Sequence, residues 1–324
     1  MLGSVACTLW VLARARDEGL NKLERVPAGV RVVVGDTPEA FDGQPPADVI
    51  FVCSMGRELL RSVLPKAPTV RWVHSRSVGV EGILFPGLAE SGVTLTNGRG
   101  VFSASLAEWV IGAVLFFAKD FRRLVKSQEA GKWDPFPPGM LEGRWMGIVG
   151  YGDIGRAVAA RARSLGMRVR ALRRNTSAPP GDPVPDEMLP PERLTDLMAL
   201  SDDVVVATPL TADTRGLIGE REIRAMKPTG VLVNVGRGAV VQEQPLVEAL
   251  RARAIRGAAL DVFETEPLPA GHPFYKLDNV LLSPHSADQV PGWLDEAMNG
   301  FLDNLDRYLA GQPLQNVVDP RRGY

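Results

Sequence analysis

An apolar run, a glycine-rich turn and a helix-like segment follow one another without a gap at residues 145–164. The run WMGIV at 145–149 leads into GYGDIG at 150–155 and then into RAVAARARS. In G-x-G-x-x-G, the glycines at 150, 152 and 155 permit a tight turn and close backbone approach, and the helix N-terminus attracts phosphate. A bare motif of this kind arises by chance in a chain with 33 glycines, but the strand before it and the helix after it predict a dinucleotide pyrophosphate site.

Two arginines follow the next predicted strand, at the position that distinguishes one dinucleotide from another. After the strand at 168–172 come Arg173 and Arg174, where a chain that prefers NAD carries an acid for the ribose 2′-hydroxyl. A guanidinium binds a 2′-phosphate through charge-assisted hydrogen bonds, whereas a carboxylate repels it. The sequence therefore predicts NADP as the cofactor. NAD remains the alternative if both arginines are simply solvated loop residues.

Length and composition restrict the class of protein. The 324 residues suit two domains, and 37 basic against 38 acidic residues give no charge for nucleic-acid or membrane-surface binding. Two cysteines form neither a disulfide framework nor a metal cluster, so we expect no metal and a cytoplasmic protein. The longest apolar run, at 106–118, is too short to span a bilayer. Arg14 and Arg16 keep a short organelle-targeting segment open as an alternative.

Short apolar runs alternate with helical stretches along the whole chain, which predicts α/β units with parallel sheets. The expected strands are 30–34, 49–53, 70–74, 93–96, 145–149, 168–172, 203–207, 231–235, 258–262 and 280–282. The expected helices between them are 57–64, 82–90, 154–165, 192–200, 220–226 and 245–253. The proline-rich stretch 178–191 is predicted to be a surface loop.

A long helix is expected to start near Ser105, because Ser105 and Glu108 have capping-box spacing. Apolar residues at 110, 114, 117, 121 and 124 continue the helical spacing, and others widen the stripe beyond one face. A helix that is apolar most of the way round is buried on several sides. Packing between the two domains is the simpler explanation, and a subunit interface is the stronger one. We expect a homodimer formed through the helix region at 105–130.

Three strand ends carry the residue types of a reduction site. Arg237 lies between two glycines after the strand at 231–235, Glu264 and Glu266 follow the strand at 258–262, and His285 follows the strand at 280–282. The carboxyl ends of parallel strands share one sheet edge, where α/β proteins bind ligands. An arginine there can bind a carboxylate, and a histidine can supply a proton while an acid holds its ring. The other histidines are expected to be a core or strand-end residue (His74) and a solvent-facing turn residue (His272).

From about residue 70 to the C-terminus, the chain resembles the D-isomer-specific 2-hydroxyacid dehydrogenase family. The motifs that carry the resemblance are GYGDIG at 150–155, TPLT at 208–211 with TRG at 214–216, MKP at 226–228, VNVGRG at 233–238, LDVF at 260–263 with EP at 266–267, and SPH at 283–285. The family pattern makes Arg237, Glu266 and His285 the catalytic residues. It selects Glu266 over Glu264 because the family's glutamate directly precedes the proline.

The resemblance also implies binding residues. The substrate-carboxylate loop falls on Ser77, Val78 and Gly79, with Arg237 and His285 completing the substrate site. The cofactor positions implied by the motifs are Gly150, Gly152, Asp153, Ile154, Gly155, Arg173, Arg174, Thr208, Pro209, Thr214, Val235, Gly236 and Asp261. Gln242 stands where many members have aspartate, and we read no loss of catalysis into it.

For the fold, the resemblance implies two Rossmann-like doubly wound parallel-sheet domains with a cleft between them. Residues 1–99 and 288–324 would form a flavodoxin-like substrate domain, and residues 100–287 the NAD(P)-binding domain. For the activity, it implies an NAD(P)-dependent oxidoreductase acting on CH–OH groups. The predicted reaction is reduction of a small 2-keto acid such as glyoxylate or hydroxypyruvate to the 2-hydroxy acid with NADPH. Two alternatives stay open: an NAD-dependent 3-phosphoglycerate dehydrogenase, and a nucleotide-sensing dimeric binding protein that acts like a co-repressor.

Overall fold

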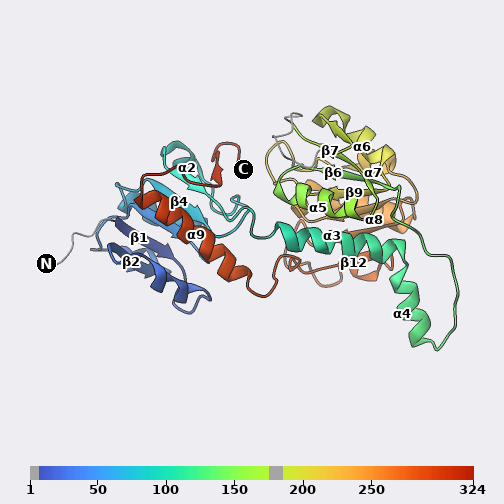
Figure 1. Cartoon of the computed structure of the whole chain (residues 1–324), viewed down its shortest axis with the longest axis horizontal. Coiled ribbons are helices and arrows are strands. Elements are labelled where there is room, and N and C mark those ends of the chain that lie inside the picture. Colours follow the sequence, from blue (N-terminus) through green and yellow to red (C-terminus); the bar gives the residue numbers. More distant parts are fainter. Residues whose placement is uncertain (1–6, 175–184) are drawn as a thin grey trace. The chain divides into compact units, whose positions relative to one another are not determined.

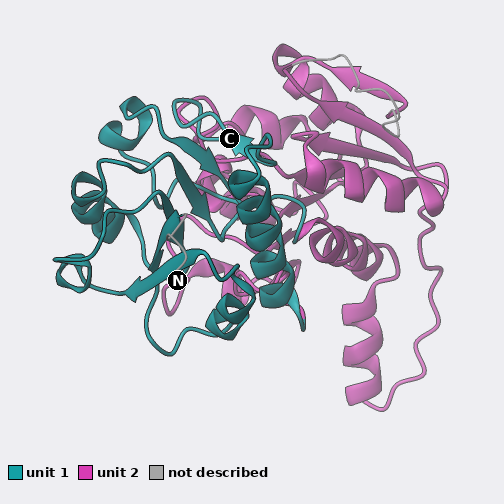
Figure 2. Cartoon of the chain, turned by 60° about the vertical axis from the view of Figure 1, so that its left-hand side comes forward, with its two compact units in different colours: residues 1–101, 291–324 teal, residues 102–290 magenta. Residues whose placement is uncertain are grey.

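The computed structural model describes residues 7–174 and 185–324, which divide into two compact units (Figure 2). Unit 1 contains Met1–Val101 and Pro291–Tyr324, and unit 2 contains Phe102–Val290. Each unit is an α/β layer structure built around one sheet. The predicted fold class of two Rossmann-like parallel-sheet units is therefore confirmed.

Unit 1 has a flavodoxin-like sheet. Its parallel strands lie in the order β2-β1-β3-β4-β5, and β13 joins β5 in antiparallel orientation. The strands are β1 (Cys7–Leu12), β2 (Val30–Gly35), β3 (Val49–Val52), β4 (Trp72–Ser75), β5 (Thr94–Thr96) and β13 (Val317–Val318). The central strands are buried on both faces, as expected for short runs of β-branched and aromatic residues covered by helices.

Helices cover both faces of the unit 1 sheet. They are α1 (Arg57–Val63), α2 (Pro86–Glu90) and α9 (Trp293–Leu309). Leucines and a valine of α1 pack with Trp10 and Ile50 on one face, and α9 packs on the other, where Phe301 stacks on Phe51 with ring centroids 4.1 Å apart.

Unit 2 has a fully parallel sheet, in the order β8-β7-β6-β9-β10-β11-β12 among the described residues. The strands are β6 (Trp145–Val149), β7 (Arg168–Leu172), β8 (Glu187–Leu189), β9 (Asp203–Val206), β10 (Val231–Asn234), β11 (Gly257–Leu260) and β12 (Val280–Leu282). The direction of winding reverses between β6 and β9. Open α/β sheets bind ligands outside the carboxyl ends of the strands at such a switch point.

Six α-helices are described in unit 2: α3 (Ser103–Ala118), α4 (Phe121–Glu129), α5 (Asp153–Ser164), α6 (Leu194–Leu200), α7 (Glu220–Ala225) and α8 (Glu243–Arg251). Helix α3 packs beside α5, whereas α6, α7 and α8 pack beside one another. Apolar side chains of α6, α7 and α8 form one core cluster with β9, β10 and β11. Figure 1 shows that α4 and the chain after it extend away from the rest of unit 2.

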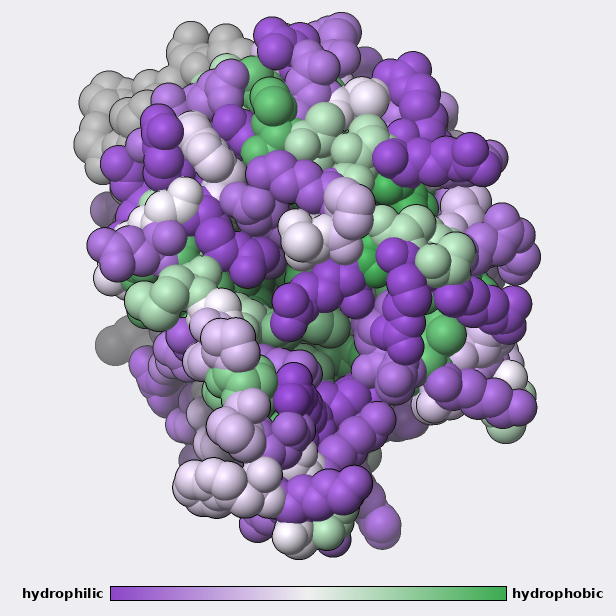
Figure 3. All heavy atoms as spheres, turned by 90° about the vertical axis from the view of Figure 1, so that its right-hand side faces the viewer, coloured by the Kyte–Doolittle hydropathy of each residue, from purple (hydrophilic) through white to green (hydrophobic). Residues whose placement is uncertain are grey.

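Short 3₁₀ turns connect several of these elements, at Leu20–Arg25, Pro38–Phe41, Leu64–Lys66, Pro191–Arg193, Gly238–Val240 and Pro273–Lys276. No helix in residues 7–174 or 185–324 combines the length and apolar character needed to cross a membrane. On the side of the molecule seen in Figure 3, hydrophobic surface shows between predominantly hydrophilic side chains.

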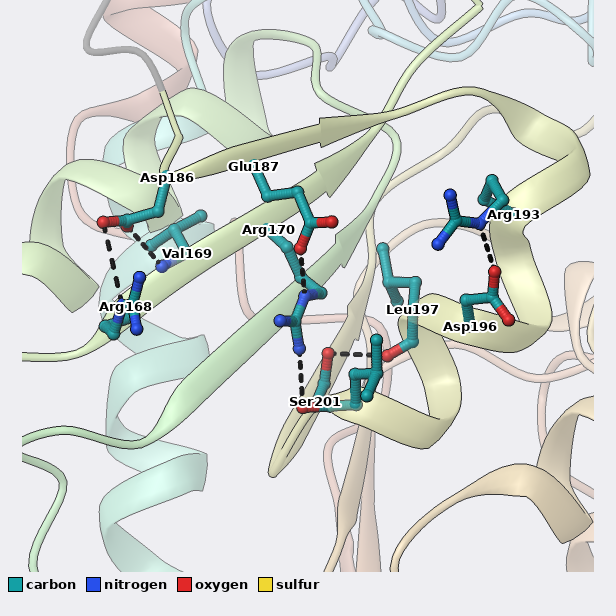
Figure 4. Close-up of polar contacts among 10 residues, drawn as sticks. Arg168, Val169, Arg170, Asp186, Glu187, Arg193, Asp196, Leu197 and Ser201 are labelled. Atoms are coloured by element: carbon teal, nitrogen blue, oxygen red, sulfur yellow. Dashed lines mark hydrogen bonds and ion pairs between the residues drawn. The ribbon is translucent and has the colours of Figure 1, made fainter.

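Polar contacts fasten the edge strand β8 to the rest of the unit 2 sheet (Figure 4). Arg170 is 6% exposed, and its guanidinium donates to Glu187 Oε2 at 3.0 Å and to the Leu200 carbonyl at 2.6 Å. Asp186 Oδ2 accepts from the Val169 amide at 2.8 Å. At the other end of the pairing, the Arg173 amide donates to the Leu189 carbonyl at 3.0 Å. The backbone of Arg173 is thereby held at the edge where cofactor selection was predicted.

The predicted long helix is wrong in two respects. Helix α3 starts at Ser103, so Ser105 lies inside it and its hydroxyl donates to the Ala287 carbonyl instead of capping the helix. The helix also ends at Ala118. Asp120 adopts φ 51°, a left-handed conformation that interrupts the helix and that aspartate tolerates better than most residues. Phe121 and Leu124 therefore belong to the separate helix α4, where they are exposed.

Other differences from the predicted elements have local causes. The helix expected at 82–90 begins only at Pro86, because proline favours the first helical position and holds the preceding residue, Phe85, in extended conformation. Part of the proline-rich stretch, Glu187–Leu189, is strand β8 rather than loop, and residues 178–184 of that stretch lie outside the described residues. Strand β1 was not predicted. Its run CTLWVL is rich in strand-forming residues and could have been recognised.

Two buried titratable residues give opposite pH dependence to the two units. Burial lowers the pKa of His74 to about 3, so unit 1 loses stability as the pH falls from about 6.5 toward 3. Burial also raises the pKa of Asp203 in β9 to about 7, although nearby Arg144 opposes the rise. The folded state then holds a proton that the unfolded chain loses near pH 4. Unit 2 therefore loses stability as the pH rises from about 4 to about 7.

Replacing Asp203 with asparagine should flatten this second dependence. An amide oxygen can still accept from Arg144 Nη2, which lies 3.0 Å from Asp203 Oδ1, but it carries no proton to lose. We expect the free energy of unfolding of Asp203→Asn to gain, relative to wild type, up to about 1.4 kcal/mol per pH unit between pH 4 and 7. Denaturant titrations across this range measure it, with Asp303→Asn on the exposed side of α9 as the control. A wild-type slope retained in Asp203→Asn would contradict the assignment.

Candidate active site

The glycine turn after β6 has the backbone geometry that the motif predicts. Gly150 adopts φ +100°, and a Cβ there would lie 2.9 Å from the backbone of Ala207 and Thr208. A Cβ on Gly155 would lie 2.4 Å from the Gly150 carbonyl oxygen, so this glycine allows the helix to pack onto the turn. A Cβ on Gly152 would meet nothing within 4 Å. The open space is therefore beside Gly152 at the start of α5, where the first helical amides have no intrahelical acceptor.

The side chains at this helix start and at the neighbouring strand end are charged. Asp153 forms an ion pair with Arg156 one turn along α5, and Ile154 follows Asp153 in the first turn. Arg173 Nη1 is buried and has no hydrogen-bond partner among the described residues. A buried, unsatisfied guanidinium nitrogen is costly unless a ligand satisfies it. The residues present therefore fit a dinucleotide, with pyrophosphate at Gly152 and an anionic group at Arg173.

The loop after β9 lies next to this turn because β6 and β9 are neighbours. Thr208 and Pro209 follow the strand after Ala207, and a Cβ on Gly236 would lie 2.7 Å from the Thr208 carbonyl oxygen. The Thr214 hydroxyl donates to the Pro209 carbonyl at 2.6 Å and so closes the loop on itself. Arg174 reaches the same loop, with Nη1 3.5 Å from Asp213 Oδ2.

Arg237 lies in a turn that the side chain of Asn234 stabilises. Asn234 Oδ1 accepts from the Gly236 amide at 3.0 Å, and Asn234 Nδ2 donates to the Arg237 carbonyl at 3.1 Å. Arg237 Nη1 donates to the Gly236 carbonyl at 2.7 Å, and Val235 before it is buried. Sequence reasoning gave Asn234 no role, although its place at the end of a buried strand was a usable signal.

Glu266 and His285 form a hydrogen-bonded pair. His285 Nδ1 lies 2.6 Å from Glu266 Oε2, and the side chains are 39% and 34% exposed. Because an ionised carboxylate only accepts, Nδ1 carries the proton that it donates, and Nε2 is left for another partner. Glu266 Oε1 accepts from the Phe263 amide at 2.8 Å, which fixes the carboxylate. Glu264 makes no such pair with His285; its amide donates to Glu243 Oε1 at 2.7 Å.

Asp261 holds the chain around His285. The His285 amide donates to the Asp261 carbonyl at 2.8 Å, and the amides of Ser286 and Ala287 donate to Asp261 Oδ1 at 3.0 and 3.1 Å. These bonds stabilise His285 at φ 51°, a left-handed conformation that costs energy for a non-glycine residue. The structure thus gives Asp261 a positioning role that was not predicted for it.

Gly238 brings the arginine turn and the glutamate loop into direct contact. A Cβ at Gly238 would lie 1.8 Å from the carbonyl carbon of Phe263 and 2.4 Å from the amide nitrogen of Glu264. The backbone of the loop that carries Glu266 therefore lies directly on the residue after Arg237. Since β10, β11 and β12 are adjacent, Arg237, Glu266 and His285 all leave one edge of the unit 2 sheet.

In unit 1, Ser77, Val78 and Gly79 follow β4 and leave three consecutive amides unused. The Ser77 carbonyl accepts from the Gly98 amide at 3.2 Å, and the Val78 carbonyl accepts from Asn97 Nδ2 at 2.6 Å. Across residues 7–174 and 185–324, no acceptor is found for the amides of residues 77–79. Successive free amides of this kind bind anions.

Two further residues near the site escaped the sequence analysis or differ from it, whereas the third histidine of the chain is as predicted. Burial raises the pKa of Asp288, and the charges of His285 and Arg237 only partly oppose the rise, so its carboxyl lies close enough to both residues to interact with them. His272 does not face solvent as predicted, because its ring packs against Phe274 and its Nε2 lies 3.4 Å from Glu243 Oε2. His74 is a core residue.

Comparison with known proteins places these features in a family. The sequence model of the D-isomer specific 2-hydroxyacid dehydrogenase NAD binding domain matches residues 111–287. The chain belongs to the D-isomer specific 2-hydroxyacid dehydrogenase family. Members are oxidoreductases that act on the CH–OH group with NAD(P), and the matched residues include the glycine turn, Arg237, Glu266 and His285.

Individual members of the family are similar over most of the chain. A D-3-phosphoglycerate dehydrogenase of Methanocaldococcus jannaschii is 31% identical over 94% of this chain, which spans 57% of that protein. Glyoxylate/hydroxypyruvate reductase B of Pectobacterium atrosepticum is 33% identical over 88% of this chain and 90% of its own. A family member from Xanthobacter autotrophicus, solved with NADPH and MES, has a TM-score of 0.81 and 30% identity, covering 98% and 99% of the two chains.

The backbone contact at Gly238 predicts that a single methyl group disrupts catalysis by this family member. Gly238→Ala must separate the turn of Arg237 from the loop of Glu266, and displacements of about 1 Å at a catalytic group cost roughly 100-fold in rate. We expect kcat with a 2-keto acid to fall by about that factor. Gly300→Ala is the matched control, because a Cβ at Gly300 in α9 meets nothing within 4 Å. Wild-type kcat in a folded Gly238→Ala protein would show that the contact is not needed.

Proposed function

We propose that this protein is an NADPH-dependent reductase of a small 2-keto acid, such as glyoxylate or hydroxypyruvate. The observation that carries the proposal is the hydrogen-bonded Glu266–His285 pair, which leaves the same sheet edge as Arg237 and the glycine turn. The glyoxylate/hydroxypyruvate reductase among the relatives, matched over 90% of its own length, supports this substrate class.

Each catalytic residue has a role that follows from its chemistry. The Arg237 guanidinium binds the substrate carboxylate and polarises the keto oxygen, because a planar cation with several donors suits both tasks. His285 donates the proton from Nε2 to that oxygen as it becomes a hydroxyl. Glu266 orients the ring through Nδ1 and stabilises the imidazolium form before the transfer. The bound nicotinamide supplies the hydride.

The three amides at residues 77–79 of unit 1 bind the substrate carboxylate in this proposal. They have no acceptor among the described residues, while the carbonyls of Ser77 and Val78 are held by Gly98 and Asn97, so the amides remain as donors for an anion. We accordingly assign substrate binding to unit 1, predicted as residues 1–99 and 288–324, and dinucleotide binding to unit 2, predicted as residues 100–287.

The preference for NADPH rests on Arg173. Its Nη1 is buried and has no partner in the part of the chain that the structure describes, which suits the 2′-phosphate of NADPH, and the similar structure from Xanthobacter autotrophicus was solved with NADPH. The remaining predicted cofactor positions are assigned by the same proposal: Gly150, Gly152, Asp153, Ile154 and Gly155 at the pyrophosphate, Thr208, Pro209 and Thr214 beside the adenosine half, and Val235, Gly236 and Asp261 beside the nicotinamide.

A second candidate is NAD-dependent 3-phosphoglycerate dehydrogenase, the name of a relative that is 31% identical. The chain spans little more than half of that relative. Arg173 stands where an NAD enzyme carries an acid, and this observation favours the reductase.

We also propose a cytoplasmic homodimer. The two described cysteines, Cys7 and Cys53, are free and buried, which suits a reducing compartment. On and after α4, large hydrophobic side chains are exposed: Phe121, Leu124, Val125, Trp133 and Met140. A second copy would cover them. Leu124→Glu should then give monomers in sedimentation equilibrium, and an unchanged dimer would place the interface elsewhere.

Initial rates test the proposed activity. The purified protein is assayed with NADPH and NADH against glyoxylate, hydroxypyruvate, pyruvate and 3-phosphohydroxypyruvate. Fast NADPH oxidation with glyoxylate or hydroxypyruvate is the expected result. Preference for NADH with the phosphorylated substrate would favour the second candidate, and turnover with none of the pairs would refute the proposed substrate class.

Cofactor selection by the arginines is tested with a double variant, Arg173→Asp with Arg174→Ala. Removing a charge-assisted contact and adding a repelling charge should raise KM for NADPH by about 10- to 100-fold and leave KM for NADH nearly unchanged. Arg193→Ala serves as a control, because Arg193 is exposed and pairs with Asp196 in the next turn (Figure 4). Equal effects on the two cofactors would mean that these arginines do not recognise the 2′-phosphate.

A further inference from the structure

A part-buried guanidinium lies directly before the amide-rich loop of unit 1. Arg76 is the first residue after β4, and Ser77 follows it. Its side chain is 13% exposed and forms an ion pair with Asp17, whose side chain is 7% exposed. Nη1 lies 2.7 Å from Asp17 Oδ1 and 3.0 Å from Cys53 Sγ, so one nitrogen contacts both partners. The guanidinium carbon lies 5.6 Å from the centre of the Trp293 ring.

These partners come from segments that are far apart in sequence. Asp17 lies in the connection after β1, Cys53 directly follows β3, and Trp293 is the first residue of α9. Arg76 thus links three elements at the carboxyl edge of the unit 1 sheet. Burial is the main cause that raises the pKa of Cys53 to about 12, with Arg76 opposing the rise, so the sulfur is a neutral thiol. The Cys53 thiol here accepts the hydrogen bond from Arg76 Nη1 and packs beside the guanidinium.

The backbone of Arg76 is fixed as firmly as its side chain. Its amide donates to the Val52 carbonyl at 3.0 Å, and a Cβ on Gly98 would lie 2.4 Å from its carbonyl oxygen. The Ser77 and Val78 carbonyls are also held, so the loop is anchored on the side that follows β4. The direction in which the amides of residues 77–79 point therefore depends on where the end of β4 is held.

We propose that Arg76, through its ion pair with Asp17, is a positioning residue for the carboxylate-binding loop at residues 77–79. Both charges of this part-buried ion pair lose most of their hydration, which offsets their attraction and makes a purely stabilising role a poor explanation for it. Arginine suits the task because a rigid fork orients its donors, whereas a lysine ammonium is a flexible point charge. The proposal rests on the proposed function, in which this loop binds the substrate carboxylate.

Conservative variants test the role. In Arg76→Lys and Asp17→Asn we expect KM for the 2-keto acid to rise about 10-fold or more, with kcat within about 3-fold of wild type and unchanged NADPH affinity. This pattern marks the loss of a binding interaction that ground state and transition state share. Thermal unfolding followed by circular dichroism establishes that each variant is folded.

Asp48→Asn is the matched control. Asp48 precedes β3 at the opposite edge of the same sheet, where its Oδ2 accepts from the Thr8 amide at 2.8 Å. Like Asp17→Asn, this variant replaces a carboxylate that links two segments of unit 1 with an uncharged amide, but far from the loop. Its KM should stay at the wild-type value. An equal rise of KM in Asp48→Asn, or unchanged KM in both Arg76→Lys and Asp17→Asn, would overturn the proposal.

A binding measurement separates this inference from the proposed activity. Oxalate carries carboxylates but no reducible ketone, so its affinity for the NADPH-bound protein, measured by calorimetry, does not depend on turnover. Weaker oxalate binding by Arg76→Lys than by wild type and Asp48→Asn supports the inference, even if every 2-keto acid tested proves inactive. Oxalate affinity that is the same in all three proteins, or no oxalate binding by wild type, overturns it.

Discussion

The contact of backbone on backbone at Gly238 is the constraint on which the site depends. A parallel sheet brings the ends of β10, β11 and β12 to one edge, but neighbouring strand ends are still several ångströms apart. The loop that carries Glu266 closes this gap by lying directly on Gly238, because no side chain stands between them. Arg237 precedes that contact, and Glu266 in turn holds His285. The three side chains that we propose as catalytic are thereby held together by the absence of one methyl group.

Short polar side chains also hold the loops at the strand ends in place in both units. Asn234 closes the turn of Arg237, Asp261 holds the chain around His285, and Asn97 fixes the loop at residues 77–79. In each case a side-chain oxygen or amide at a strand end satisfies backbone groups of the chain nearby. Loops at a sheet edge have few backbone partners of their own, so such bonds are what hold them in one conformation. The ion pair of Arg76 with Asp17 extends the same arrangement to the end of β4.

Much of the fold and the family could be predicted from the sequence, because the relevant signals are local. The strands at 145–149 and 280–282 were predicted with their observed bounds, and the glycine turn has the conformation expected of its motif. The interrupted helix was not predicted, since apolar spacing continues past Lys119 and nothing nearby marks the left-handed residue Asp120. The positioning roles of Asp261 and Arg76 depend on partners about 20 to 60 residues away. Periodicity and motif spacing carry no information about such pairings.

The central claim is that His285 and Glu266 act as one catalytic unit. A double-mutant cycle of His285→Ala and Glu266→Gln, measured as kcat/KM with NADPH and the preferred 2-keto acid, tests it most directly. Groups that act as a unit are strongly non-additive, because once the histidine is gone the glutamate has nothing to orient. The account predicts that the double variant is no slower than His285→Ala alone. Losses that multiply would show that the two residues act independently and would contradict the account.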